Sequence, residues 1–527
     1  MSSYTLLPYT ADNLANALSG NFSDNKSKTF TTSQEVKEKK HFAYFSEYLG
    51  MEDGVKAKTI VIEHEYISKD YLVDYAAYYA SCFDDYPKKC NRIHFFSSEF
   101  DAEKFDEIIL QSEKSDQNEE NKVYQQFWDS YLGYIVAKPI PLRVIGKTVL
   151  KTYPKKDSDA ERHYFGNRTY HINIFGNNIP IDSLAYLEQD GIVSVCATSA
   201  IWMMLQKASC NNYAILKTPS EITDEADIVG THGERLFPNN GLSLNQISKS
   251  IFHSGLVTEI RTDKKINLTN SYLKRIVLAY SPIGIPILLI MQVPYKTKDN
   301  NAAHDFHAVT ATGYKISKYN EAPPSEKISW RSDSITKIFV HDDGWGPFAR
   351  LHFGEGESTL YNNWSEKFEP RQPVHLTDIV IPVYHKIRIS YDNVEAIVNA
   401  VDKILWRIYK DNTTSNVSWD IKLNYSKEYK KQSKQFTTVL AKKIHLLPMP
   451  KYIWIADCYI AGILIFQILF DATDVATGMF GLNICFHNEE IKTQLHHSLQ
   501  ANPKFAEYFY HDSNQQFYNF LIRESSP

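Results

Sequence analysis

The apolar residues of this chain alternate between the two-residue period of β-strands and the 3.6-residue period of helices. In the first third, Lys58–Glu65 alternates as a strand, and Lys69–Phe83 carries tyrosines at helical spacing. Tyr131–Tyr153 follows as two strand-like pieces broken by Pro139 and Pro141, since proline cannot donate to a sheet ladder. These patterns predict an N-terminal α/β domain over residues 41–178.

The first forty residues have little periodicity and are rich in Ser, Asn, Thr and Lys. Such a composition buries too little apolar surface to fix a conformation. We therefore expect residues 1–40 to form a loose segment.

The middle of the chain places helical patterns before strand patterns. A short loop leads into an apolar helix from Ala197, with Ile201, Met204 and Leu205 on one face. Another helix follows a capping Ser243, and Ile285–Val293 is apolar enough for a strand buried on both faces. Helices followed by an antiparallel sheet indicate an α+β domain, which we assign to residues 179–383.

After Tyr384 the pattern changes to a third α/β unit, residues 384–527. Its expected elements are the helices Asn393–Tyr409 and Phe436–His445 and the strands Ser418–Tyr425, Tyr452–Ile460 and Ile463–Phe470. The last two strands together resemble a membrane span in hydropathy. Asp457 argues against a span, because an aspartate near a helix centre costs about 2.5–3.5 kcal/mol on insertion scales.

Composition supports a folded chain of about three domains, since 527 residues exceed one compact core. The balance of 57 basic against 62 acidic residues gives a net charge of −5. This charge offers no electrostatic footprint for nucleic acid, so no nucleic-acid partner is expected.

The six cysteines form neither a disulfide framework nor a paired metal-ligand spacing. Residues 1–13 lack the basic and apolar parts of a signal peptide. We expect reduced thiols in a cytoplasmic protein, with no metal and no cofactor.

Cys196 falls where the loop ends and the apolar helix begins. The unpaired N–H groups and the positive end of the helix dipole favour an anion there, and a thiolate is an anion. The alternative is a small buried hydrophobic residue, which is the commoner role of a free cysteine.

Two later segments favour the nucleophile. His307 opens a strand-like run of small and β-branched residues, with 302–306 as the loop leading in, and another strand ends at Asp342 and Asp343. His307 follows Cys196 by 111 residues and Asp342 follows it by 146, near the separation of about 130 to 150 residues typical of a Cys, His and Asp or Asn triad in this order. Because strand residues alternate between faces, we expect Asp342 to face His307 and Asp343 to face the turn.

In these motifs the chain resembles the papain-like cysteine peptidase superfamily, in particular its bacterial double-glycine-leader peptidase branch. The resemblance covers roughly Ile179–Val383. It implies a central papain-like domain, with a Cys-bearing helix packed on an antiparallel sheet, and it assigns an oxyanion-hole role to Gln189. Gln189 lies seven residues before Cys196, where those families usually have six. The turn at 343–346 is similar to the Asn-Ser-Trp-Gly turn of papain-like enzymes, which makes Asp343 the alternative to Asp342.

The resemblance implies a cytoplasmic thiol hydrolase, a cysteine peptidase or isopeptidase acting on a protein or peptide through a thioester acyl-enzyme. Deamidation or acyl transfer of the transglutaminase type would use the same residues. An alternative from another class is a non-catalytic interaction scaffold with a papain-like fold. Under either hypothesis the flanking domains are expected to bind partners and to supply no catalytic groups.

Overall fold

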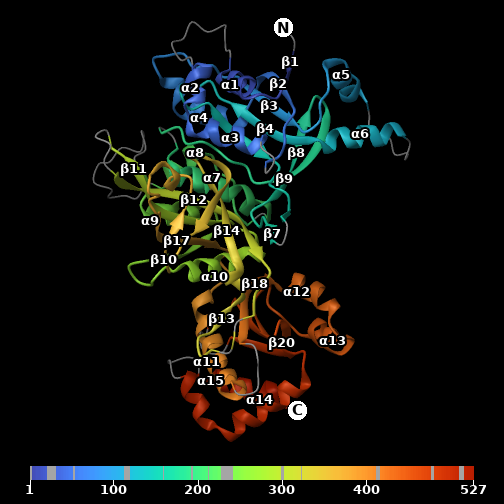
Figure 1. Cartoon of the computed structure of the whole chain (residues 1–527), viewed down its shortest axis with the longest axis vertical. Coiled ribbons are helices and arrows are strands. Elements are labelled where there is room, and N and C mark those ends of the chain that lie inside the picture. Colours follow the sequence, from blue (N-terminus) through green and yellow to red (C-terminus); the bar gives the residue numbers. More distant parts are fainter. Residues whose placement is uncertain are drawn as a thin grey trace.

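The fold is α+β, with helices packed on three main sheets that follow one another along the molecule (Figure 1). The computed structural model describes residues 3–20, 31–50, 54–111, 119–157, 160–191, 194–211, 213–226, 241–297, 302–321, 323, 325–410, 416–475, 480–509 and 515–526. We call residues 3–183 the N-terminal region, 184–383 the central region and 384–526 the C-terminal region.

The N-terminal region is built on an antiparallel sheet of order β1-β2-β3-β4-β5. Its strands are β1 (Tyr4–Pro8), β2 (Thr59–Tyr66), β3 (Cys90–Phe96), β4 (Tyr131–Ala137) and β5 (Ile145–Leu150). Its helices are α1 (Ala11–Ser19), α2 (Ser33–Lys37), α3 (Lys40–Gly50), α4 (Lys69–Ala77), α5 (Ala102–Leu110) and α6 (Glu119–Asp129). The strands and helices expected after residue 58 are present, but the sheet is antiparallel, so the region is an α+β rather than an α/β unit.

The expectation of a loose segment over residues 1–40 is wrong for the residues described there. β1 pairs with β2, and α1 buries Leu14 and Leu18 completely. Thr10 caps α1, and Thr32 forms a capping box with Glu35 at the start of α2. The polar composition concealed a narrow apolar stripe, and a few buried leucines with good caps are enough to fix a short helix against a sheet.

Two hairpins connect the N-terminal and central regions. β8 (Arg168–Ile174) pairs with β9 (Asn177–Ser183), and β6 (Lys156–Asp157) pairs with β7 (Ala160–His163). β7 also pairs with β12 of the central sheet. Strands from before residue 179 therefore extend the central sheet.

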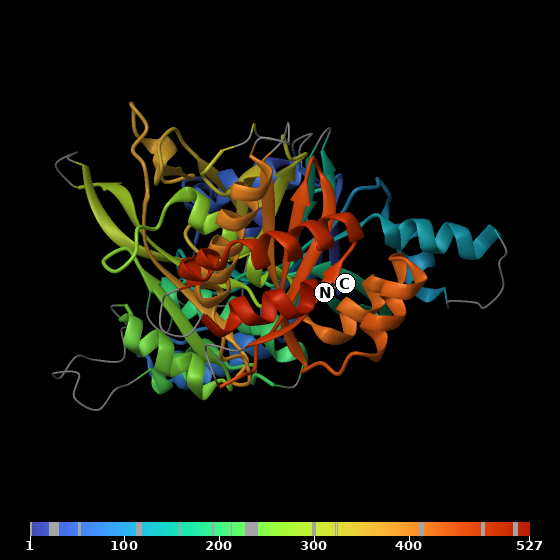
Figure 2. The same ribbon diagram turned by 90° about the horizontal axis from the view of Figure 1, so that it is seen from below.

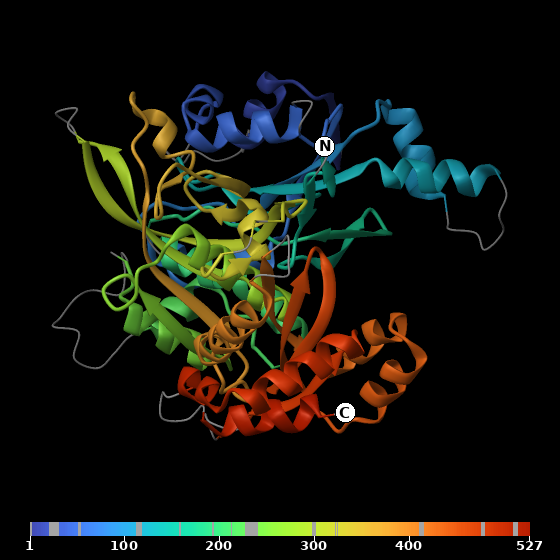
Figure 3. The same cartoon turned by 60° about the horizontal axis from the view of Figure 1, so that its bottom comes forward.

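The central sheet has the order β10-β17-β11-β12-β14-β15-β16 and is antiparallel. Its strands are β10 (Val257–Thr262), β11 (Ile287–Lys296), β12 (Ala302–Ser317), β14 (Ile335–Asp342), β15 (Gly346–Phe353), β16 (Leu360–Tyr361) and β17 (His375–Val383). Its helices are α7 (Cys196–Ala208), α8 (Pro219–Glu225), α9 (Leu244–His253) and α10 (Asn270–Tyr280). The β11–β12 hairpin extends beyond the other strands, in yellow-green at the upper left of Figure 3.

His307 lies inside β12 and does not begin it, contrary to the expectation of a loop over 302–306. The earlier residues of β12 pair with β11, for example Asp305 with Val293 and His304 with Pro294. These polar residues lack a strand-like pattern by themselves. Pairing with an apolar neighbouring strand decides their conformation.

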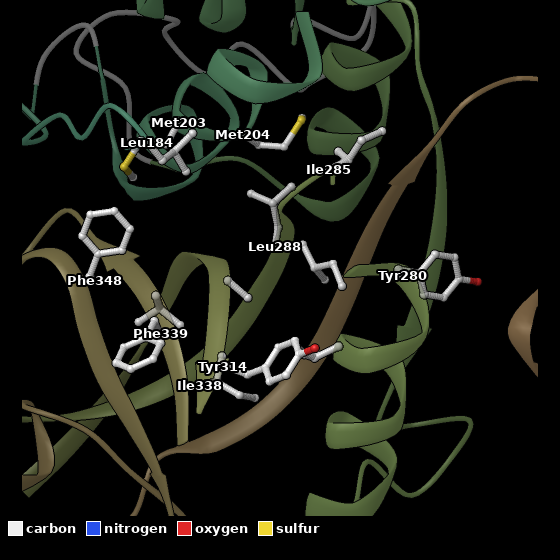
Figure 4. Packing of buried hydrophobic residues seen from close by; sticks show 14 of the residues in the cluster. Leu184, Met203, Met204, Tyr280, Ile285, Leu288, Tyr314, Ile338, Phe339 and Phe348 are labelled. Atoms are coloured by element: carbon white, nitrogen blue, oxygen red, sulfur yellow. The ribbon is translucent and has the colours of Figure 1, made fainter. Parts of the chain in front are cut away.

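Helix α7 is buried almost all round rather than on one face. Ile201, Trp202, Met203, Met204 and Leu205 are each 0% exposed. Figure 4 shows Met203 and Met204 above side chains of the central sheet, among them Leu288, Phe339 and Phe348. The helix that begins with Cys196 is thus held within the core.

The C-terminal region has a sheet of order β13-β18-β19-β20-β21, antiparallel except for the β13–β18 pair. Its strands are β13 (Ser329–Trp330), β18 (Val417–Tyr425), β19 (Tyr452–Ile460), β20 (Ile463–Asp471) and β21 (Gly481–Phe486). Its helices are α11 (Tyr391–Tyr409), α12 (Ser426–Gln432), α13 (Thr438–Leu446), α14 (Glu489–Ala501) and α15 (Gln515–Ser525). Seen from below, α14 and α15 lie on the outer side of this region, with α15 against β21 (Figure 2). The sheet takes β13 from before residue 384, and it is antiparallel where an α/β unit was expected.

The apolar stretch Tyr452–Phe470 forms two paired strands, β19 and β20, as expected. Asp457 lies opposite Gln467 in that pair, and the Gln467 amide donates to the Asp457 carboxylate at 2.6 Å. Within the described ranges, no helix is both long enough and apolar enough to cross a membrane.

Candidate active site

Cys196 occupies the first position of α7, directly after the N-cap residue Val195. Its side chain is half-buried. The preceding loop is tied to itself, because the Asp190 carboxylate accepts a hydrogen bond from the Ser194 N–H at 2.9 Å. The thiol is therefore held at the end of a buried helix by a closed loop.

His307 reaches the thiol from strand β12. The Cys196 side chain contributes to raising the pKa of His307, and the imidazole is 6% exposed. The buried Thr310 hydroxyl, three residues along β12, donates to the Ala200 carbonyl of α7 at 2.9 Å. This bond fixes the strand that carries the histidine against the helix that carries the cysteine.

Asp342 closes the arrangement from the end of β14. The His307 Nε2–H donates to Asp342 Oδ1 at 2.8 Å, which leaves Nδ1 as the nitrogen able to take a proton from the thiol. Asp342 also accepts from the Gly344 N–H at 3.0 Å and from the Trp364 indole N–H at 3.0 Å. The carboxylate is thus oriented on both oxygens.

The pKa values of His307 and Asp342 move in opposite directions. Burial by itself would lower the pKa of His307, but the charge and hydrogen bond of Asp342 outweigh burial and raise it well above the usual value. Burial would raise the pKa of Asp342, yet the His307 charge and its hydrogen-bond donors hold it below the usual range. The pair favours an imidazolium next to a carboxylate.

Asp343 also lies near His307, contrary to the expectation that it faces away. Its Oδ1 is 3.5 Å from His307 Nε2. Strand alternation fails here because β14 ends at Asp342 and the chain turns, with the Trp345 N–H bonded to the Asp342 carbonyl at 2.9 Å. Asp343 is fully buried, and neither carboxyl oxygen is hydrogen-bonded to another described residue. Burial raises the pKa of Asp343 to about 7.

Gln189 lies in the loop that leads to Cys196, and its side chain is half-buried. The loop is anchored on either side of it. Before it, the fully buried Glu188 accepts from Lys39 Nζ at 2.6 Å and from the Ile145 N–H at 3.0 Å. After it, Asp190 accepts from the Tyr79 hydroxyl at 3.1 Å. An oxyanion-hole role for Gln189 remains an expectation.

Sequence reasoning missed several residues that surround this cluster. Trp364 packs edge-on against the His307 ring, with centroids 5.3 Å apart, and Lys40 Nζ lies 3.8 Å from the centre of the Trp364 indole. Burial and the nearby Lys367 lower the pKa of Lys40 to about 8. Trp364 carries no motif, and Lys40 ends a segment expected to be loose, so neither gave a sequence signal. Glu188 gave none either, because its burial and its need for a cationic partner follow from the packing of the N-terminal region on the loop.

His307, Asp342 and Asp343 also offer three ligand atoms within 4.8 Å of one another. Two ligands of a tetrahedral zinc ion, each about 2.0–2.1 Å from the metal, would be roughly 3.3 Å apart. The 2.8 Å between His307 Nε2 and Asp342 Oδ1 is shorter and is typical of a hydrogen bond. The spacing therefore fits a histidine–carboxylate pair better than two ligands of one ion.

The arrangement provides a thiol next to an imidazole that is hydrogen-bonded to a carboxylate. Such an order can transfer the thiol proton to the imidazole and hold the resulting charge pair. Neither protein-family models, curated proteins nor solved structures match the chain. The class of protein is therefore argued from the α+β fold and from this cluster of side chains.

Proposed function

We propose that the chain is a thiol hydrolase, a cysteine peptidase or isopeptidase with a papain-like central domain. The observation that carries the proposal is the Cys196 side chain next to His307, whose imidazole is hydrogen-bonded to Asp342. The cysteine at a helix start supports the same reading, because the helix dipole favours a thiolate there.

In the proposed reaction, the Cys196 thiol gives its proton to His307 Nδ1 and the sulfur attacks the carbonyl carbon of an amide. The backbone N–H of Cys196 and the side-chain amide of Gln189 are the proposed donors to the oxyanion. The imidazolium returns the proton to the leaving amine as the C–N bond breaks, and a thioester remains on Cys196. Water, deprotonated by His307, then hydrolyses the thioester, and the thiol is regenerated.

Deamidation and acyl transfer pass through the same thioester and differ only in the leaving group or the acceptor. Deamidation releases ammonia from a side-chain amide, and a transferase passes the acyl group to an amine in place of water. The proposal commits to hydrolysis of an amide bond in a protein or peptide.

The first test is labelling of the full chain with a peptidyl chloromethyl ketone, followed by intact mass measurement. The wild-type chain is expected to gain one adduct, and Cys196→Ala none. Cys210→Ala is the matched control, since Cys210 is an exposed free thiol at the opposite end of α7 and has no role in the proposed chemistry. This variant should label like the wild type.

Labelling of Cys210 or Cys82 ahead of Cys196 would show that the nucleophile is misassigned. If no peptide-mimetic electrophile labels the folded chain, the result favours the non-catalytic scaffold. Hydrolysis is separated from acyl transfer by adding an amine acceptor to a peptide substrate and comparing the product masses.

A further inference from the structure

Lys39 and the first turn of helix α3 contact the loop before Cys196 and the turn after Asp342. Lys39, Lys40 and His41 come from the N-terminal region, more than a hundred residues before Cys196. Helix α3 also packs against β15, the strand that follows the Asp342 turn. Its position therefore bears directly on the geometry of the cluster.

His41 contacts the turn at residues 342–346, between β14 and β15, which we call the acid turn. It is 5% exposed, and its Nε2–H donates to the Asp343 backbone carbonyl at 2.7 Å. Tyr186 donates to the same carbonyl at 3.1 Å. These two donors fix the peptide between Asp343 and Gly344. The N–H of this peptide donates to Asp342 Oδ1 at 3.0 Å, so the two donors also act on the direction in which the Asp342 carboxylate points.

Lys39 is the contact to the loop before Cys196. Its Nζ lies 2.6 Å from Glu188 Oε1, and the Glu188 side chain is 0% exposed. Glu188, Lys39 and Asp342 are the charged groups that act on His41, and its Nδ1 is 3.8 Å from Glu188 Oε1. Burial lowers the pKa of His41, and Nε2 carries the proton that it donates to the Asp343 carbonyl.

Lys40, between them, lies over the Trp364 ring that donates to Asp342. Three consecutive residues thus contact three parts of the site. Lys39 contacts the loop that holds Gln189, Lys40 contacts the Trp364 ring, and His41 contacts the acid turn. A helix that served only to cover apolar surface would not need polar contacts at each of these places.

We propose that the N-terminal region is an integral part of the candidate active site and that His41 is a positioning residue, which sets the Asp342–His307 geometry through the Asp343 carbonyl. This inference rests on the proposed function and deepens it. It changes the expected role of the flanking region from partner choice alone to support of the catalytic geometry.

The test compares His41→Leu, which removes the donor, with His41→Gln, whose amide nitrogen can reach the Asp343 carbonyl. The readout is the rate of Cys196 alkylation by iodoacetamide from pH 5 to pH 10 in the full chain. His41→Leu should slow alkylation at pH 6 by about tenfold, equivalent to one pH unit in the thiolate population. The difference should shrink toward alkaline pH, and His41→Gln should restore the wild-type profile.

Tyr48→Phe is the matched control on the same helix. The Tyr48 hydroxyl donates to the Lys151 carbonyl at 2.6 Å, away from the acid turn. Its loss should lower the midpoint of thermal unfolding slightly and leave the alkylation rate at pH 6 unchanged. If His41→Leu does not fold, His41→Asn replaces it, because the shorter amide stays polar but falls short of the carbonyl.

A second readout is the pH midpoint of the His307 imidazole, followed by NMR in a histidine-labelled chain. It should fall in His41→Leu and not in Tyr48→Phe. A folded Leu or Asn variant with a wild-type midpoint overturns the positioning role whether or not Cys196 is reactive. If Cys196 of the wild-type chain reacts no faster than Cys210 at pH 6, the proposed function is contradicted. If the His307 midpoint still falls in His41→Leu, the positioning role is supported even then.

Discussion

Asp342 and Asp343 are neighbours in the chain, and both lie near the same histidine, yet their surroundings give them opposite properties. Asp342 accepts hydrogen bonds from His307, Gly344 and Trp364, which stabilise its charge. Asp343 is equally buried without comparable donors. Desolvation therefore dominates at Asp343 and hydrogen bonding at Asp342, so only Asp342 is suited to orient the imidazole as a carboxylate.

Asp343→Asn is expected to stabilise the protein increasingly as pH rises. Because the folded-state pKa of Asp343 is raised to about 7, its contribution to stability is fully present below its unfolded pKa and is lost as pH rises through 7. From pH 5 to pH 8 the variant should gain at most about 3 kcal/mol relative to the wild type. Thermal unfolding across this range measures the change.

Asp342→Asn is the control for that measurement. The folded-state pKa of Asp342 is lowered, so its contribution is present above the unfolded pKa and lost only as pH falls. The substitution should destabilise the protein at both pH 5 and pH 8. A parallel pH trend in the two variants would contradict the assignment of the neutral carboxyl to Asp343.

At the scale of elements, the contacts between distant segments determine where each candidate residue lies. The Thr310–Ala200 hydrogen bond joins β12 to α7, and the pairing of β12 with β14 brings His307 near Asp342. The described part of the first forty residues belongs to this framework, because β1 extends the N-terminal sheet and the helices beside it lead into α3.

Leu18→Ala tests whether this N-terminal segment is integral to the fold. Leu18 is 0% exposed, so the substitution should cost about 2–5 kcal/mol of unfolding free energy. Asn16→Ala, on the exposed side of α1, should change it by less than about 0.5 kcal/mol. If both substitutions change the free energy of unfolding in urea by a negligible amount, the N-terminal segment is loose, as its composition suggested.

At the scale of the whole molecule, one contiguous cluster of buried apolar side chains runs through all three regions, and a second, smaller cluster lies within the C-terminal region. Tyr280 of α10 and Trp454 of β19 are both fully buried, and their ring centroids are 5.2 Å apart. β13 leaves the central region to pair with β18. The C-terminal region thus shares its core with the central one.

A chain ending at Val383 is therefore expected to aggregate. It would expose Tyr280, and β13 would lose the strand it pairs with. Light scattering coupled to size exclusion should detect oligomers where the full chain elutes as a defined species, and Cys196 alkylation should lose its selectivity. A monodisperse truncated chain with wild-type alkylation would show that the central region folds by itself.

The sequence by itself determined the elements with strong periodicity and the residue types of the candidate site. β19 lies at Tyr452–Ile460, where alternation and apolar density predicted a strand, and α7 begins at Cys196, within a residue of its expected start. Local patterns suffice there because burial of a continuous apolar run requires one conformation. Cys196, His307 and Asp342 were proposed from their order and spacing in the chain.

Only the tertiary structure decided which groups surround those residues. The start of β12 depends on its pairing with β11. The inward side chain of Asp343 depends on the turn after β14, which brings it near His307. The conformation of residues 3–20 depends on β2, which is distant in sequence. The contacts of Lys39, Lys40 and His41 with Glu188, Trp364 and Asp343 had no local signal at all. A polar side chain at a helix start reads as solvent-exposed in sequence, and only the packing of one region on another removes the water and makes it part of a site.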